Sequence, residues 1–180
     1  MKMNEILISE NTYKSDDLYS VVYNNSKIIN YLLSKEIDPK ELHPDALASC
    51  YVDYYFSQVN GAGLSKFVHA SGWDKEMLDS IEYGLKSINA INHLDWFIAK
   101  RNEIDTTIPQ QQLEEYLELE YAVDDPLRIK LDEDKAFYFM KDEIIELNAQ
   151  WLKEHKDTVI LSMDDIFAKL EEIVGKPIEK

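Results

Sequence analysis

Residues 47–73 read LASCYVDYYFSQVNGAGLSKFVHASGW, and this stretch decides the fold. In a chain that is 30% charged, Asp53 is the only charged residue between Ala46 and Ser65. Apolar residues recur at spacings of three and four, and on a helix they cover most of its circumference. This pattern predicts a buried helix with neighbours on several sides. His43-Pro44-Asp45 predicts where that helix begins, because proline fits the first helical position. Asp53, Gln58 and three tyrosines disfavour a membrane span.

The glycines after this helix predict a corner between two helices. Asn60-Gly61 is expected to end the helix, because glycine takes the left-handed conformation without a Cβ clash. A short helix should follow over residues 64–71, with Asp74 capping the next one. The run Gly61–Lys66 lacks the spacing of a phosphate-binding loop, and a helix is predicted before it where such loops follow a strand. We therefore favour the structural interpretation, a tight helix–helix corner.

Residues 51–73 resemble the signature of a bacterial family named for a DNA-mimic protein. That signature is an aromatic helix, an Asn-Gly-x-Gly-like turn, and a Phe-containing helix that closes in Ser-Gly-Trp. The residues that carry the resemblance are Asn60, Gly61, Gly63, Phe67, Ser71 and Trp73. The resemblance covers about residues 44–100, more weakly toward its end, and it lies in residues of a structural type. It implies the fold most directly, and beyond that a non-enzymatic protein that binds a DNA-binding protein.

The composition limits the class of partner. The chain has 35 acids and 19 bases, a net charge of −16, and 45% hydrophobic residues. The hydrophobic content predicts a folded chain, and the charge repels nucleic acid and anionic membranes while attracting basic surfaces. Its 180 residues predict one acidic helical domain, with a family-like core at about 44–100 and an acidic half at 103–180. The lone Cys50 and the lack of a signal-peptide pattern predict a reducing, cytoplasmic setting.

The periodicity predicts a mainly α-helical domain of about seven helices. The expected helices cover residues 15–38, 44–60, 64–71, 74–101, 109–123, 132–156 and 162–174, with a break near Asn89–Asn92. Residues 102–108 are expected to form a loop. Two stretches, 127–131 and 158–161, read as extended and are candidates for one short two-stranded β element.

The acids are concentrated in one part of the sequence. From Glu103 to Asp134 there are eleven acids and two bases, whereas the chain up to Ala90 has 13 acids and 8 bases. Duplex DNA presents one charge per about 1.7 Å of axis, and acids four residues apart on a helix lie about 6 Å apart. The charges of one helix are therefore spaced too widely to match duplex DNA. A mimic needs several acidic segments side by side, or one segment repeated in a homodimer, and the sequence does not decide between these arrangements. The predicted partner-binding residues are Glu114, Glu115, Glu118, Glu120, Asp124, Asp125, Asp132, Glu133 and Asp134.

No catalytic, cofactor or metal site is predicted. His43, His69, His93 and His155 form no zinc-binding spacing, and one cysteine cannot supply the usual thiolate set. The run Asp132-Glu133-Asp134-Lys135 contains an acid-x-lysine pair of the nuclease type, but it reads as a helix start. Ser65 and His69 are four apart, yet no oxyanion donor or third catalytic partner is visible.

Three hypotheses follow. The first is a non-enzymatic DNA mimic that binds the basic face of a DNA-binding protein, such as a transcription factor, with no direct contact to nucleic acid or membrane. The second is a helical adaptor whose groove is lined by residues 51–56 and 137–139, with acidity serving only solubility. The third is a small-molecule enzyme with a polar pocket near Asn60 and His69.

Overall fold

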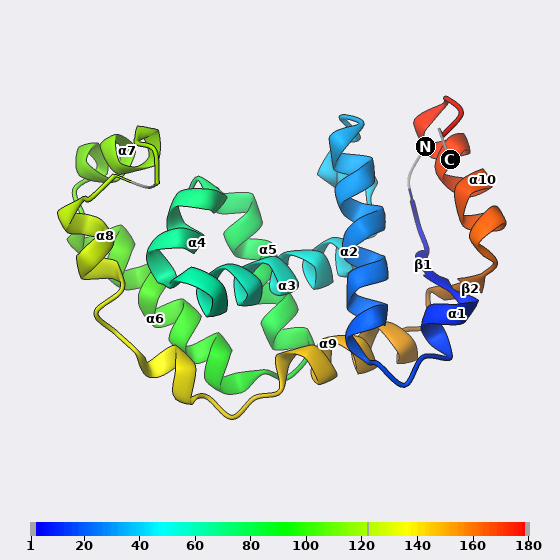
Figure 1. Ribbon diagram of the computed structural model, residues 1–180, viewed down its shortest axis with the longest axis horizontal. Helices are drawn as coiled ribbons and strands as arrows, with labels where there is room; N and C mark the ends of the chain where they lie inside the picture. Colours follow the sequence, from blue (N-terminus) through cyan, green and yellow to red (C-terminus); the bar gives the residue numbers. More distant parts are fainter. Residues whose placement is uncertain (1–2, 122, 179–180) are drawn as a thin grey trace. The chain divides into compact units, whose positions relative to one another are not determined.

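A computed structural model describes residues 3–121 and 123–178 (Figure 1). Within these residues the fold is mainly helical, with ten α-helices, two 3-10 helices and one small parallel sheet, which confirms the predicted fold class. The elements are β1 Ile6–Ser9, α1 Glu10–Tyr13, α2 Tyr19–Ser34, η1 Pro39–Glu41, α3 Pro44–Ala62, α4 Leu64–Ser71, α5 Lys75–Ser87, α6 Ile91–Thr107, α7 Gln110–Glu118, α8 Pro126–Leu131, η2 Ala136–Phe139, α9 Ile144–Glu154, β2 Thr158–Leu161 and α10 Met163–Val174. None of the described helices is both long and apolar enough to cross a membrane.

The chain divides into two compact units. The terminal unit contains both ends of the chain, residues 1–53 and 144–180, and the central unit is residues 54–143. Helix α3 contributes its first half to the terminal unit and its last turns to the central unit.

The terminal unit is built on the pairing of the two strands. Strands β1 and β2 run parallel, from Ile6 opposite Thr158 to Ser9 opposite Leu161, and all four β1 residues are buried. The extended prediction for 158–161 is confirmed, but its partner is β1 and not residues 127–131, which form α8. Helices α2 and α10 pack against β1, and the core between them is aliphatic. Cys50 lies in this core as a thiol, and burial raises its pKa to about 12.

The central unit is organised around the side chain of Tyr55, which has no exposed surface. Its ring packs edge-on against Phe67, Phe97 and Phe137, with centroids 5.5, 5.2 and 5.9 Å away. Its hydroxyl lies 3.2 Å from Nδ1 of His93. Burial lowers the pKa of His93, so this imidazole stays neutral inside the aromatic core.

Several predicted boundaries are wrong. Helix α3 continues through Gly61 to Ala62, and the residue that interrupts the chain is Gly63, with φ at 95°. Residues 102–107 are the last turns of α6, not a loop. Helix α7 ends at Glu118, and α2 begins at Tyr19, where the Asp17 carboxylate accepts the backbone N–H of Tyr19.

The largest error concerns residues 132–156, which were predicted as one helix. Residues 132–143 contain only the short η2, and α9 begins at Ile144. The acids of this segment suggested a helix start, yet Asp132 and Asp142 cap other helices. Local capping rules read such acids as the beginning of their own helix, so they do not detect caps for helices distant in sequence.

Candidate protein-binding surface

The corner between α3 and α4 is held by Asp132. One Asp132 oxygen accepts the backbone N–H of Ser65 at 2.9 Å, and the other accepts the Ser65 hydroxyl at 2.6 Å. Asp132 therefore caps the N-terminus of α4, which has no side-chain cap of its own. A Cβ atom at Gly63 would overlap the Asp132 carboxylate, and the positive φ of Gly63 also favours glycine.

The other motif residues build the far end of the same corner. Phe67 is fully buried, and Gly72 ends α4 in the left-handed conformation, with φ at 61°. The hydroxyl of Ser71 accepts the backbone N–H of Trp73 at 3.2 Å. The indole N–H of Trp73 donates to Asp105 at 2.8 Å. The exposed Asn60 and Gly61 lie in the last turns of α3, whereas Gly63 makes the turn itself.

Asp134 also has a structural role. It accepts the backbone N–H of Ala136 at 2.8 Å and the indole N–H of Trp96 at 3.2 Å, and it forms an ion pair with Lys100 at 2.9 Å. These donors lower the pKa of Asp134, the Ala136 hydrogen bond most of all. The carboxylate therefore anchors the start of η2 to α6.

Helix α7 and the segment that follows it are hydrogen-bonded to α4. The buried Tyr116 donates its hydroxyl to the backbone oxygen of Ser65 at 3.0 Å, and the Tyr121 hydroxyl lies 2.9 Å from the Ser65 hydroxyl. Helices α7 and α8 both contact α4. Helix α7, with its three glutamates, and α8, which has no acid but is flanked by Asp124-Asp125 and Asp132–Asp134, are therefore both packed against α4.

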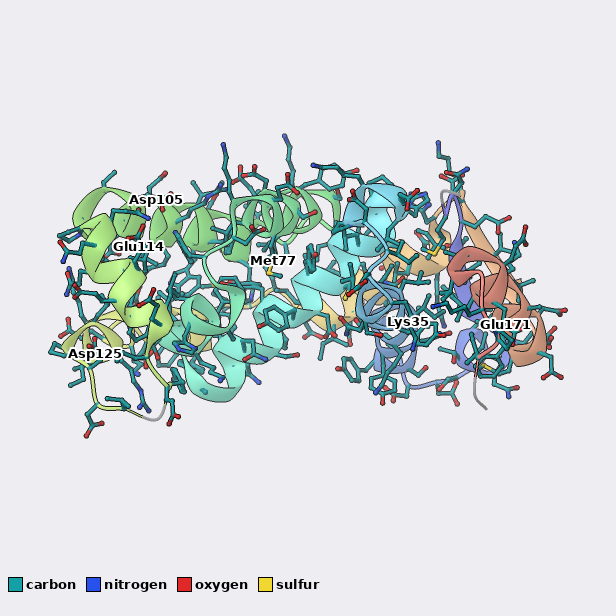
Figure 2. All side chains as sticks on the ribbon, turned by 90° about the horizontal axis from the view of Figure 1, so that it is seen from above. Lys35, Met77, Asp105, Glu114, Asp125 and Glu171 are labelled. Atoms are coloured by element: carbon teal, nitrogen blue, oxygen red, sulfur yellow. The ribbon has the colours of Figure 1, made fainter. Side chains whose placement is uncertain are left out.

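Six of the nine predicted partner-binding acids have exposed side chains, and three are engaged in the fold. The exposed ones are Glu114, Glu115, Glu118, Glu120, Asp124 and Glu133. Gln110 and Gln111 donate hydrogen bonds to Glu114 and Glu115. Besides Asp132 and Asp134, Asp125 has a structural role, because it caps α8 by accepting the backbone N–H of Leu127 at 2.7 Å. Figure 2 shows Asp105, Glu114 and Asp125 at the same end of the central unit.

Charge in the central unit is not evenly spread. The unit has 18 acids and 9 bases, and residues 103–134 contain eleven of these acids and two of the bases. The remainder of the unit is balanced, with seven of each. The whole excess of negative charge in the central unit therefore lies in one segment, which we call the acidic segment.

The model of one protein family, described as DMP19-like protein, matches residues 40–155, more than half of the chain. The chain belongs to the DMP19-like family. This confirms the resemblance inferred from residues 51–73 and extends it beyond residue 100. Searches of curated proteins and of solved structures found no match.

The matched range of this DMP19-like chain contains the entire central unit. The corner at Gly63, its cap Asp132 and the acidic segment all lie within the part that the family shares. The sequence showed the glycine and the acids separately. The structure connects Gly63 with Asp132, because the Asp132 carboxylate occupies the space that a side chain at position 63 would need.

Two catalytic alternatives, the Ser65–His69 pair and the nuclease-like run of acids, find no support in this geometry. Ser65 is hydrogen-bonded to Asp132, whereas Nε2 of His69 lies 2.7 Å from the backbone oxygen of Leu119. The two side chains thus have different partners and do not form a nucleophile–base pair. The acids of the nuclease-like run lie on no strand, and Asp132 and Asp134 hold helices in place.

Proposed function

We propose that this DMP19-like chain is a non-enzymatic DNA mimic. It binds the basic, DNA-contacting face of a DNA-binding protein, such as a transcription regulator, and competes with DNA for that face. The observation that carries the proposal is the confinement of the central unit's charge excess to the acidic segment. Three glutamates of this segment lie on α7, acids also flank α8, and both helices contact α4. Membership of a family named for a DNA mimic supports the same role.

The exposed carboxylates take the place of phosphates. Glu114, Glu115 and Glu118 follow one another on α7, and Asp124 and Glu133 lie on either side of α8. The hydrogen bond of Tyr116 to α4 positions the helix before binding, so little conformational entropy is lost on association. Arginine and lysine of the partner pair with these groups and release counterions, which makes binding strongly salt-dependent.

The other three predicted acids contribute to partner binding through their electrostatic field and not through direct contact. Asp125, Asp132 and Asp134 are engaged by backbone, hydroxyl, indole or lysine donors within the unit. Their charges still add to the negative potential that steers a basic partner toward the surface.

The test uses two triple variants that change the net charge equally. The first is Glu114→Gln, Glu115→Gln and Glu118→Gln in the acidic segment. The control is Asp16→Asn, Glu154→Gln and Glu172→Gln, which are exposed acids of the terminal unit. The untagged chain is immobilised, partners are eluted with a salt gradient, and a purified partner is then titrated against its labelled DNA by fluorescence anisotropy.

The wild-type chain should displace the DNA, with an affinity that falls steeply as salt rises. Loss of three exposed ion pairs at about 0.5–1 kcal/mol each predicts roughly tenfold to hundredfold weaker competition by the first triple variant. The control triple variant should compete nearly as well as wild type. Equal loss in both variants, or binding that is indifferent to salt, contradicts the proposal.

The adaptor hypothesis retains one supporting observation. Phe137 is buried, but Phe139 is 80% exposed and Tyr138 is 47% exposed. An adaptor that uses these rings should lose its partner in a Phe139→Ser variant and keep it at high salt. A DNA mimic should show the opposite pattern, because its contacts are ionic.

A further inference from the structure

Two His-x-Asp sequences meet in the terminal unit. His43-Pro44-Asp45 begins α3, and His155-Lys156-Asp157 joins α9 to β2. In each pair the backbone N–H of the aspartate donates to Nδ1 of its own histidine at 3.2 Å. Each histidine also reaches the aspartate of the other pair. Nε2 of His43 lies 3.3 Å from the Asp157 carboxylate, and Nε2 of His155 lies 2.8 Å from that of Asp45.

We infer that this cluster is a binding site for a divalent transition-metal ion of the zinc type. The ligands are Nε2 of His43, Nδ1 of His155 and a carboxylate oxygen of Asp157. One donor atom from each residue lies within 4.8 Å of the other two. Bonds of about 2.0–2.1 Å in a tetrahedral zinc site place donors roughly 3.3 Å apart. The His43–Asp157 separation is already 3.3 Å, and the His155–Asp157 separation is 3.9 Å.

Asp45 supports this assignment from outside the ligand set. Metal-binding histidines donate their second ring N–H to a carboxylate, which selects the tautomer and orients the ring. Asp45 receives Nε2–H of His155 in this way, leaving the lone pair of Nδ1 on the side of Asp157. The ion then replaces the 3.2 Å backbone N–H of Asp157 as the partner of that lone pair.

His43 requires one adjustment. Its Nδ1 now accepts the N–H of Asp45, so its proton resides on Nε2, which faces Asp157. Coordination through Nε2 moves that proton to Nδ1, where it would face the N–H of Asp45, so the imidazole ring must turn away from this second donor. Such first-turn N–H groups have no partner within their own helix in any case.

Charge and access also fit a divalent cation. The two carboxylates carry a charge of −2, and the ammonium group of Lys156 lies 4.0 Å from the Asp157 carboxylate, so the local charge stays negative and attracts a cation. The side chains of His43 and His155 are only 8% and 12% exposed, whereas that of Asp157 is 38% exposed and opens the site to water. Two nitrogens and one oxygen favour zinc, cobalt or nickel over calcium and magnesium, which take oxygen ligands. The bound ion would link residues 114 positions apart in the sequence.

The experiment is calorimetric titration of the untagged full chain with Zn²⁺ after chelator treatment, together with the visible absorption of a Co²⁺ complex. We expect one ion per chain. His155→Gln and Asp157→Asn should each weaken binding at least tenfold, and Asp45→Asn should weaken it about 10–100-fold through the orientation of His155.

Two controls separate this site from other zinc-binding groups. His69→Gln removes a histidine of the central unit, and the Glu114, Glu115 and Glu118 triple variant removes surface carboxylates. Both should bind zinc as wild type does. Absence of saturable binding, or unchanged affinity in folded Asp157→Asn, overturns the proposal. The half-exposed Asp157 is the deciding position if a histidine variant fails to fold by circular dichroism, because asparagine retains its hydrogen-bonding shape.

Discussion

The terminal and central units are equal in length and nearly equal in charge, yet they use that charge differently. The terminal unit has 17 acids and 10 bases, and the central unit has 18 and 9. In the terminal unit the surplus acids are distributed over both ends of the chain. In the central unit all of the surplus lies in the acidic segment. The placement of charge, and not its total, therefore distinguishes a candidate binding surface from a solvated exterior.

The cores differ as well. The terminal unit buries mainly aliphatic side chains around β1, whereas the central unit packs aromatic rings around Tyr55. Aromatic rings bury a large area each and interact with defined geometry. A few of them can therefore stabilise a unit whose surface carries repelling charges in one segment.

Removal of the Tyr55 ring should destabilise the chain more than any other change proposed here. Tyr55→Ala should lower the free energy of unfolding by about 3–5 kcal/mol, because it leaves a cavity at the centre of the central unit. Leu32→Ala is the matched change in the terminal unit, since Leu32 is also fully buried. Denaturant titration measures the cost, and amide hydrogen exchange shows where protection is lost. If both variants lose hydrogen-exchange protection at the same amides, the two units do not unfold independently.

The next effect tests the corner at Gly63. Gly63→Ala should destabilise the chain by about 2–3 kcal/mol, since the new Cβ meets Asp132 and the backbone φ is positive. Asp132→Ala should cost about 1–3 kcal/mol by leaving Ser65 without its cap. The Gly63→Ala, Asp132→Ala double variant should lose less unfolding free energy than the sum of the two single variants. Without the Asp132 carboxylate, the new Cβ at position 63 has no steric clash.

Gly61→Ala is the control for that cycle. Gly61 is helical, and a Cβ there has nothing within 4 Å. The substitution should therefore stabilise the chain by about 0.5–1 kcal/mol. If Gly61→Ala destabilises the chain and Gly63→Ala does not, the helix ends at Gly61, as the sequence predicted.

A smaller effect contrasts two aspartates whose pKa values shift in opposite directions. Burial raises the pKa of Asp53 in the terminal unit above its ordinary 3.8, with the Ser26 hydroxyl opposing the shift. Hydrogen bonds, first from Ala136 and then from Lys100, lower the pKa of Asp134 in the central unit. The contribution of Asp134 to stability is therefore present above pH 3.8 and is lost as pH falls through its folded pKa, whereas that of Asp53 is lost as pH rises.

Asparagine variants measured by urea denaturation across pH check this contrast. At neutral pH, Asp134→Asn should destabilise by about 0.5–1 kcal/mol, a small value because its side chain is one-third exposed and screened. Asp53→Asn should stabilise, since it removes a charge that burial disfavours. Shifts of the same sign in both variants would contradict the assigned environments.

The smallest effect concerns the stability cost of the acidic segment. Like charges four residues apart, such as Glu114 and Glu118, destabilise a helix by about 0.2–0.5 kcal/mol. The Glu114, Glu115 and Glu118 triple variant should therefore melt slightly higher than wild type at low salt, and the difference should disappear at high salt. The terminal-unit triple variant should show a smaller change in the same thermal scan.

Local sequence rules succeeded where an element depends on its own residues. Proline at the start of α3, Asp74 as the cap of α5, and Ser162 with Gly175 at the two ends of α10 were all predicted from the sequence. They failed at Gly61 and at residues 132–143. There the deciding partner lies many positions away, as Asp132 does for α4 and Asp142 for α6.

The helical class and the concentration of acids between residues 103 and 134 follow from periodicity and composition, which can be read along the chain. The family follows from its resemblance to the signature in residues 51–73. The folded arrangement is needed to show which acids hold helices and which face solvent, that β1 pairs with β2, and that two His-x-Asp pairs meet. The physical reason is that caps, strand pairing and side-chain clusters depend on distance in space. Residues more than a hundred positions apart approach one another only when the core has formed around them.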